Sequence, residues 1–288
     1  MAEGRRAPLR IVLALSLALG TAALAVEETS AGLIGRIVVA GYGPELPVMQ
    51  DMAKAFEKVH PGAALDIEWD RTVKAVEMVK AGEAQIAVAD HEDATLRGVP
   101  IAWDGIAAVV NSSNPIKEVT REQVRELLTG KITRWSNLDG ADTKVEVIER
   151  PMDQNLTVGL DQSLGIMERH APTRTVRSDE QALSTVSGKD SGITYVSLAT
   201  ALKAQEDGVP IRVLLVDKVE PGEPTVKDGR YPLRRPVILL TRIQPDPLTE
   251  AFVSFAQSPE GQRIVKMMFV PYSPAPAQPE HAQSSSAG

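Results

Sequence analysis

Short apolar runs alternate with longer amphipathic segments over the first part of the chain. Residues 36–40, 64–69 and 85–89 are runs typical of strands. Between them, residues 46–60 carry apolar side chains at helical spacing, and 73–81 form a second helical segment. A strand–helix–strand–helix–strand order predicts the parallel sheet of an α/β fold.

A longer apolar run at 101–111 exceeds the usual length of a surface strand, which predicts a strand that crosses from one lobe to another. Residues 192–196 form a later strand and are the candidate for a return crossing. Further strands and two closing helices are expected at 211–216 and 236–241, and at 246–256 and 259–268, respectively.

The middle of the chain contains a clear helix start. Thr120 is followed three residues later by Gln123, the pattern of a capping box, so a helix is expected over 120–128. A strand is expected at 145–148, and Arg150 lies just beyond its carboxyl end. In open α/β sheets ligands bind beyond the carboxyl ends of the strands, so Arg150 is a candidate ligand contact, although it could also pair with a neighbouring acid.

The chain opens with the layout of a secretory signal peptide. Basic residues up to Arg10 precede an apolar run at 11–24, and Ala23 and Ala25 are the small residues that a signal peptidase accepts. The run is shorter than the roughly 20 residues that span a bilayer. We therefore expect a signal peptide over 1–25 and no membrane anchor.

Composition narrows the compartment and the partners. The sequence contains no cysteine, so it offers neither a disulfide framework nor a lipid-accepting thiol, and we expect a soluble periplasmic protein. We also expect a monomer. A formal net charge of −7 argues against nucleic-acid binding but leaves room for an anion in a local pocket. The Pro-, Ala-, Gln- and Ser-rich tract at 272–288 is expected to be disordered.

Five ordered blocks of sequence strongly resemble the periplasmic phosphate-binding proteins of ABC transporters. These are DGIAAVVN at 104–111, LLTGKITRW at 127–135, GITYV at 192–196, DGRYPLRRP at 228–236 and SPEGQ at 258–262. The resemblance implies a type 2 periplasmic-binding fold: two α/β lobes joined by two crossing strands, closing on a ligand in the cleft. Lobe one would comprise 33–108 plus 197–271, and lobe two 109–196.

The resemblance also implies where the ligand is held. Asp90 matches the family carboxylate that accepts a proton from the ligand, although an Asp after a strand often only starts a turn or caps a helix. Arg150 matches the family's charge partner. The full set of expected ligand contacts is Tyr42, Gly43, Thr72, Asp90, Arg150, Asn155 and Thr157.

The expected ligand loops depart from the family pattern. Hydroxyl donors are missing from the first loop, where Pro44 lacks an N–H and Glu45 should repel an anion, and from the loop after Arg150. A buried oxyanion loses about 1–3 kcal/mol for each missing partner, so phosphate binding is expected to be weakened. Tyr42 and Trp69 would suit a larger or partly organic ligand.

Three functions remain open from the sequence. The leading one is a solute-binding protein that captures phosphate or another small oxyanion or acid by lobe closure and presents it to an ABC permease. The second is a sensory or accessory module with a degenerate cleft. The third, a metal-dependent enzyme using the acidic loop 90–93, has little support, because adjacent side chains rarely point to one metal and no nucleophile motif is present. No metal or cofactor is expected.

Overall fold

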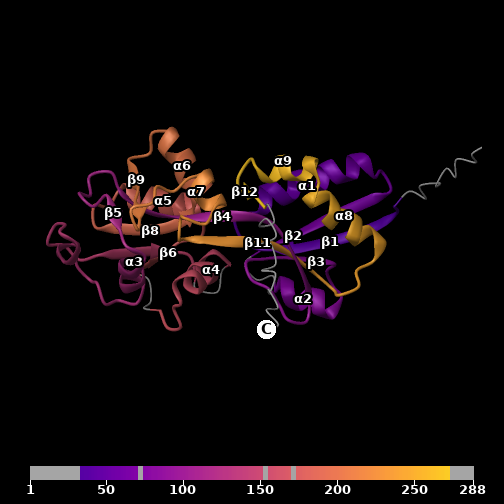
Figure 1. Ribbon diagram of the computed structural model, residues 1–288, viewed down its shortest axis with the longest axis horizontal. Helices are drawn as coiled ribbons and strands as arrows, with labels where there is room; N and C mark the ends of the chain where they lie inside the picture. Colours follow the sequence, from indigo (N-terminus) through magenta and orange to yellow (C-terminus); the bar gives the residue numbers. More distant parts are fainter. Residues whose placement is uncertain (1–32, 71–73, 152–154, 170–172, 273–288) are drawn as a thin grey trace, which may run out of the picture. The chain divides into compact units, whose positions relative to one another are not determined.

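The computed structural model describes residues 33–70, 74–151, 155–169 and 173–272 (Figure 1). The signal peptide expected at 1–25 and the tail beyond Tyr272 lie outside the described residues and stay predictions. No helix in the described part of the chain is long and apolar enough to cross a membrane.

The first half is the predicted strand–helix–strand–helix–strand unit. Strand β1 pairs in parallel with β2 on one side and β3 on the other, which confirms the parallel α/β arrangement. Its elements are β1 (Gly35–Gly41), α1 (Leu46–Val59), β2 (Ala63–Trp69), α2 (Ala75–Ala81) and β3 (Ile86–Ala89).

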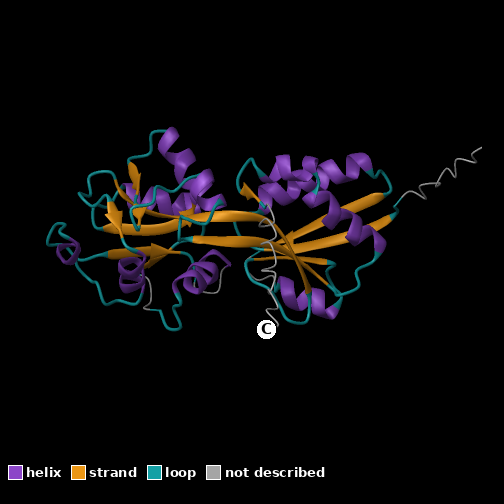
Figure 2. Ribbon diagram, viewed as in Figure 1, coloured by secondary structure: helices purple, strands orange, loops and turns teal. Residues whose placement is uncertain are grey.

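One long strand, β4 (Arg97–Asn111), belongs to both halves. Its first part pairs antiparallel with β11 (Arg234–Thr241), and its second part pairs with β8 (Gly192–Ser197). The crossing predicted at 101–111 is therefore confirmed, and Figure 2 shows β4 and β11 passing between the two sets of helices.

The second half surrounds the sheet β4-β8-β6-β7, with β9 also paired to β4. The predicted capping box is present: the Thr120 side chain accepts from Gln123 N, and the Gln123 side chain accepts from Thr120 N. Its elements are β5 (Glu118–Val119), α3 (Arg121–Leu128), the 3-10 helix η1 (Trp135–Leu138), β6 (Glu146–Glu149), α4 (Asn155–Leu164), β7 (Arg174–Thr175), α5 (Asp179–Ser187), α6 (Leu198–Glu206), β9 (Ile211–Val213), β10 (Leu215–Val216) and α7 (Glu223–Lys227).

The return crossing differs from the expectation. Residues 192–196 lie inside the second half as β8, between β4 and β6, and the chain returns to the first half through β11 instead. Apolar side chains at 198–233 share one core with the second half of β4, including Leu198, Ile211, Val226 and Tyr231. We therefore propose lobe boundaries near 105 and 233 in place of 108 and 197.

The chain closes on the first half with α8 (Pro247–Gln257), α9 (Pro259–Val265) and β12 (Val270–Pro271), which pairs with β4. Helices α1, α8 and α9 cover one face of the sheet β2-β1-β3-β11-β4, and α2 covers the other (Figure 1). The carboxyl ends of β1 and β3, and that of β6 in the second half, are followed by the loops in which the ligand contacts are expected.

Candidate ligand-binding site

A crevice of about 290 Å³ lies where the loop after β1 meets the start of α5. Its volume is at the lower end of the range for small-molecule sites, so it would suit a small ligand. The N-termini of α1 and α5 lie at this crevice, and the positive ends of the helix dipoles favour an anionic group there. Pro47 of α1 has no N–H, and the Ser178 side chain already accepts from Gln181 N in α5. The lining residues are Tyr42, Gly43, Pro44, Leu46, Pro47, Arg150, Arg177, Ser178, Asp179, Glu180, Thr200 and Met268.

Arg150 follows β6 directly and is only 7% exposed. Its guanidinium forms an ion pair with Asp179, the first residue of α5, and not with the adjacent Glu149, which pairs with Arg169. Burial, followed by the positive charge of Arg235, lowers the pKa of Arg150 to about 10, so this side chain stays charged at neutral pH. A second hydrogen bond holds Asp179, because its Oδ2 accepts from Ser197 N at 2.9 Å.

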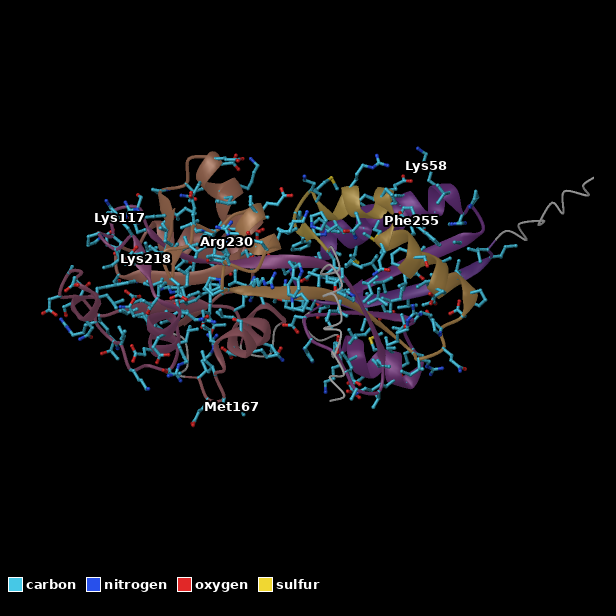
Figure 3. The ribbon with its side chains drawn as sticks, viewed as in Figure 1. Lys58, Lys117, Met167, Lys218, Arg230 and Phe255 are labelled. Carbon is cyan, nitrogen blue, oxygen red and sulfur yellow. The ribbon has the colours of Figure 1, made fainter. Side chains whose placement is uncertain are left out.

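Arg235 and Asp104 form a buried pair and are not among the residues that line the crevice. They lie directly opposite each other on β11 and β4, and Arg235 Nη2 and Nε donate to Asp104 Oδ2 at 2.9 and 3.1 Å. Ser197 Oγ donates to the other carboxylate oxygen of Asp104 at 2.7 Å. An ion pair and hydrogen bonds therefore connect Arg150, through Asp179, Ser197 and Asp104, to Arg235. Arg230, labelled in Figure 3, is by contrast exposed and pairs with Asp228.

Glu45 supplies a second carboxylate to Arg235. It occupies the N-cap position of α1, yet its side chain makes no cap hydrogen bond; it is fully buried and forms an ion pair with Arg235 Nη2. The repulsion expected of Glu45 is thus offset by a cation that the sequence interpretation did not assign to the site. Desolvation raises the pKa of Glu45, and Arg235 offsets only part of that effect because Asp104 shares the same guanidinium.

Asp90 follows β3 and is 1% exposed. Its Oδ1 lies 2.6 Å from His91 Nδ1, and this contact raises the pKa of the imidazole. Its Oδ2 faces Gly159 of α4: a Cβ on Gly159 would lie 2.9 Å from Asp90 Oδ2 and 3.0 Å from the Arg235 side chain. Asp90 and Arg235 therefore meet at one point under α4.

Three buried polar atoms in this cluster have no hydrogen-bond partner among the described residues. They are Asp90 Oδ2, Arg235 Nη1 and Glu45 Oε2. Buried polar atoms in proteins are nearly always paired, so these three atoms are candidates for contact with a further group. The cluster offers both a guanidinium donor and carboxylate acceptors.

Of the other predicted contacts that the structure describes, only Tyr42 and Gly43 line the crevice. Tyr42 Oη donates to Arg177 O across it at 3.4 Å. Thr157 is buried in α4. Asn155 begins α4, but its side chain lies outside the described part, as does Thr72 entirely. As ligand contacts these residues stay predictions.

Sequence interpretation placed Glu45 in the first ligand loop only as a repelling charge. It did not find Asp104, Asp179, Ser197 and Arg235 as members of the site. A signal existed for one pair: Asp104 and Arg235 are opposite charges within otherwise apolar strands, and such charges are rarely buried unless paired. The acidic loop at 90–93 contains no metal cluster. Asp93 pairs with Lys80 at 2.7 Å, and no group of three or more His, Asp or Glu side chains suited to a metal exists in the ranges that the structure describes.

A two-lobed α/β fold with a charged crevice beyond its strand ends defines the class of solute-binding folds. The chain belongs to the family of PBP superfamily domains, which matches residues 26–260. It is 34% identical over 110 residues to "Phosphate-binding protein PstS 2" of Streptococcus agalactiae serotype V, covering 36% of this chain and 38% of that relative. The chain thus aligns with well under half the length of that curated relative.

Two further relatives extend the similarity. "Phosphate-binding protein PstS" of Bacillus subtilis strain 168 is 20% identical over 239 residues, 80% of this chain and 78% of the relative. A solved structure of a putative phosphate ABC transporter substrate-binding protein with bound phosphate from Clostridium perfringens matches with a TM-score of 0.73 at 24% identity, covering 83% of this chain and all of that one. At that identity the structural match establishes the shared two-lobed fold.

Proposed function

We propose that this protein is a solute-binding protein that holds a small acid carrying a hydroxyl group, with phosphate as the first candidate, beside Asp90, Arg150 and Arg235. The relatives named for phosphate binding and the expected signal peptide support an exported protein. Delivery to an ABC permease, as a soluble monomer, belongs to the same proposal.

One observation carries this proposal. Asp90 Oδ2 and Arg235 Nη1 are buried without hydrogen-bond partners among the described residues, and both side chains pack against Gly159. A buried acceptor and a buried donor that lack partners each cost free energy unless another group pairs with them. A ligand with an acid oxygen and a hydroxyl would satisfy both atoms at once.

The same two atoms predict selectivity. Phosphate at neutral pH keeps at least one P–O–H group, which can donate to Asp90 while its charged oxygens accept from Arg235. Sulfate has no proton to donate, so one of its oxygens would face the Asp90 carboxylate with no hydrogen between them. The site should therefore prefer phosphate and small hydroxy acids to sulfate.

Thermal denaturation with phosphate, sulfate and lactate at high millimolar concentration tests this. A ligand at 100 times its Kd stabilises a protein by about 2.7 kcal/mol, which is a readily measured shift. Phosphate or lactate should raise the melting temperature more than sulfate does, and Asp90→Asn should remove the preference, whereas Asp207→Asn on the exposed end of α6 should keep it. Equal shifts with all three compounds, or none, would contradict the proposal.

A second function, an accessory module that works through protein contacts, is favoured by a different observation. Both arginines already have carboxylate partners, Arg150 in Asp179 and Arg235 in Glu45 and Asp104. If the protein is an accessory module, it should bind neither phosphate, sulfate nor lactate, and it should co-purify with a protein partner.

A further inference from the structure

Glu45 is placed where an anionic ligand group would be expected. It lies in the loop after β1, at the N-terminal end of α1, where backbone N–H groups and the helix dipole favour negative charge. Its side chain leaves those N–H groups unused and reaches Arg235, 190 positions away in the sequence. The carboxylate is fully buried there.

The local backbone fits this inward position of the side chain. Gly43 has φ of +140°, a conformation that favours glycine, and a Cβ at that position would overlap Glu45 Oε2. Glycine at 43 therefore supplies both the turn and the space into which the Glu45 carboxylate folds. A larger residue at 43 would push this carboxylate away from Arg235.

We propose that the Glu45 carboxylate is an internal stand-in for the ligand's acid group, filling the position beside Arg235 in the empty protein and leaving it when ligand binds. This inference rests on the proposed function, that a small acid binds beside Arg235. The space that the Glu45 carboxylate fills is called the anion position below.

The charges around Glu45 determine how its carboxylate affects the binding of an anion. The groups that face it are Arg235 and Asp104 on the crossing strands and Arg150 after β6. Two carboxylates already share one guanidinium, so a third anion beside Arg235 would be strongly repelled. An acid can bind only if Glu45 withdraws or becomes neutral, so Glu45 sets the affinity of the site for anions.

Calorimetric titration of phosphate at pH 8 into wild type, Glu45→Gln and Glu83→Gln tests the stand-in. Glu45→Gln keeps the size of the side chain and removes its charge, and Glu83 is exposed on the same half of the protein. Glu45→Gln should bind phosphate at least tenfold more tightly than wild type, with Glu83→Gln unchanged. Wild type and Glu45→Gln binding phosphate within twofold of each other would overturn the stand-in while leaving the proposed function intact.

Rescue by formate separates the two ideas. Glu45→Ala vacates the anion position, and formate is the smallest carboxylate that could refill it. Formate should raise the melting temperature of Glu45→Ala and leave wild type and Glu83→Ala unchanged. Rescue by formate without phosphate binding by any variant would support the stand-in and sink the phosphate assignment. The stand-in would be overturned if formate did not stabilise Glu45→Ala and phosphate did not bind Glu45→Gln.

Discussion

Arg150 and Asp179 illustrate how the site depends on buried pairs. Removing one member leaves the other charge buried and uncompensated, which typically costs 3–5 kcal/mol, whereas removing both costs less. We expect Arg150→Met to lower the free energy of unfolding by about 3 kcal/mol and the double variant with Asp179→Asn to recover part of that loss. Urea denaturation of both single variants and the double variant measures the coupling. Strict additivity would contradict the pair, and Arg174→Met on the exposed β7 is the control.

The buried carboxylate of Glu45 should make the stability of the protein depend on pH. Its pKa is raised by desolvation, so the folded state holds this proton more tightly than the unfolded chain does, and the wild type loses stability relative to Glu45→Gln as pH rises above the unfolded value near 4.5. Arg235, Asp104 and Arg150 face this carboxylate, and burial raises the pKa of Asp104 as well, so the comparison with Glu45→Gln isolates the part that depends on the Glu45 charge. Denaturation at pH 4 and pH 8 measures the free energy of unfolding of both proteins. Between pH 4 and pH 8 the wild type should lose stability relative to Glu45→Gln. A gain of stability by the wild type relative to Glu45→Gln would mean that the ion pair with Arg235 outweighs desolvation.

For single residues, the sequence predicted which side chains follow the strands better than it predicted which charged side chains pair with one another. Asp90 and Arg150 could be placed because each follows a predicted strand and matches a family residue, and both prove to be buried next to the crossing strands. Glu45 could be read only as an extra negative charge. Its partner Arg235 is far away in sequence, and no local pattern reveals that the fold brings the two together.

Among the elements, α4 makes the contact that closes the cluster. Gly159 packs against Asp90 Oδ2 and Arg235, so Gly159→Ala would gain up to about 1 kcal/mol of helix propensity but force α4 away from β11. We expect a net loss of stability of roughly 1–2 kcal/mol together with weaker ligand binding. Gly188→Ala at the end of α5, where the added Cβ meets nothing closer than 3.8 Å, should be nearly neutral in denaturation and titration. Gly159→Ala behaving like Gly188→Ala would contradict this packing.

The order of the elements was largely predictable from the sequence because strand and helix periods differ. The strand expected at 211–216 is divided into β9 and β10, which pair with different strands. A larger error concerns residues 192–196. A fully buried strand is apolar on both faces whether it crosses between lobes or lies within one, so the pattern at β8 could not distinguish the two. The pairing of β8 with β4 and β6 places this strand within the second half, and local sequence does not reveal which strands will pair.

For the whole molecule, the absence of cysteine permits a direct test of movement between the halves. Lys58 at the end of α1 and Lys117 before β5 are exposed on different halves and are labelled in Figure 3. Replacing both with cysteine and attaching a fluorophore pair should reveal a change in energy transfer when phosphate saturates a Glu45→Gln background. A matched pair at Lys54 and Glu83, both in the first half, should not respond. Bound ligand without any change would argue against movement of the lobes.

The overall fold was the most predictable property of the chain, since five sequence blocks in family order fixed the two-lobed arrangement, and the family match over 26–260 agrees. The content of the site was less predictable. Its donors and acceptors come from loops and strands that meet only after the chain has crossed twice between the halves.

The decisive measurement is a crystal structure of Glu45→Ala grown with phosphate. Phosphate should occupy the anion position, accepting hydrogen bonds from the Arg235 guanidinium and donating a proton to Asp90 Oδ2. Phosphate bound only at surface lysines, with the space beside Arg235 refilled by water or by another protein side chain, would contradict it.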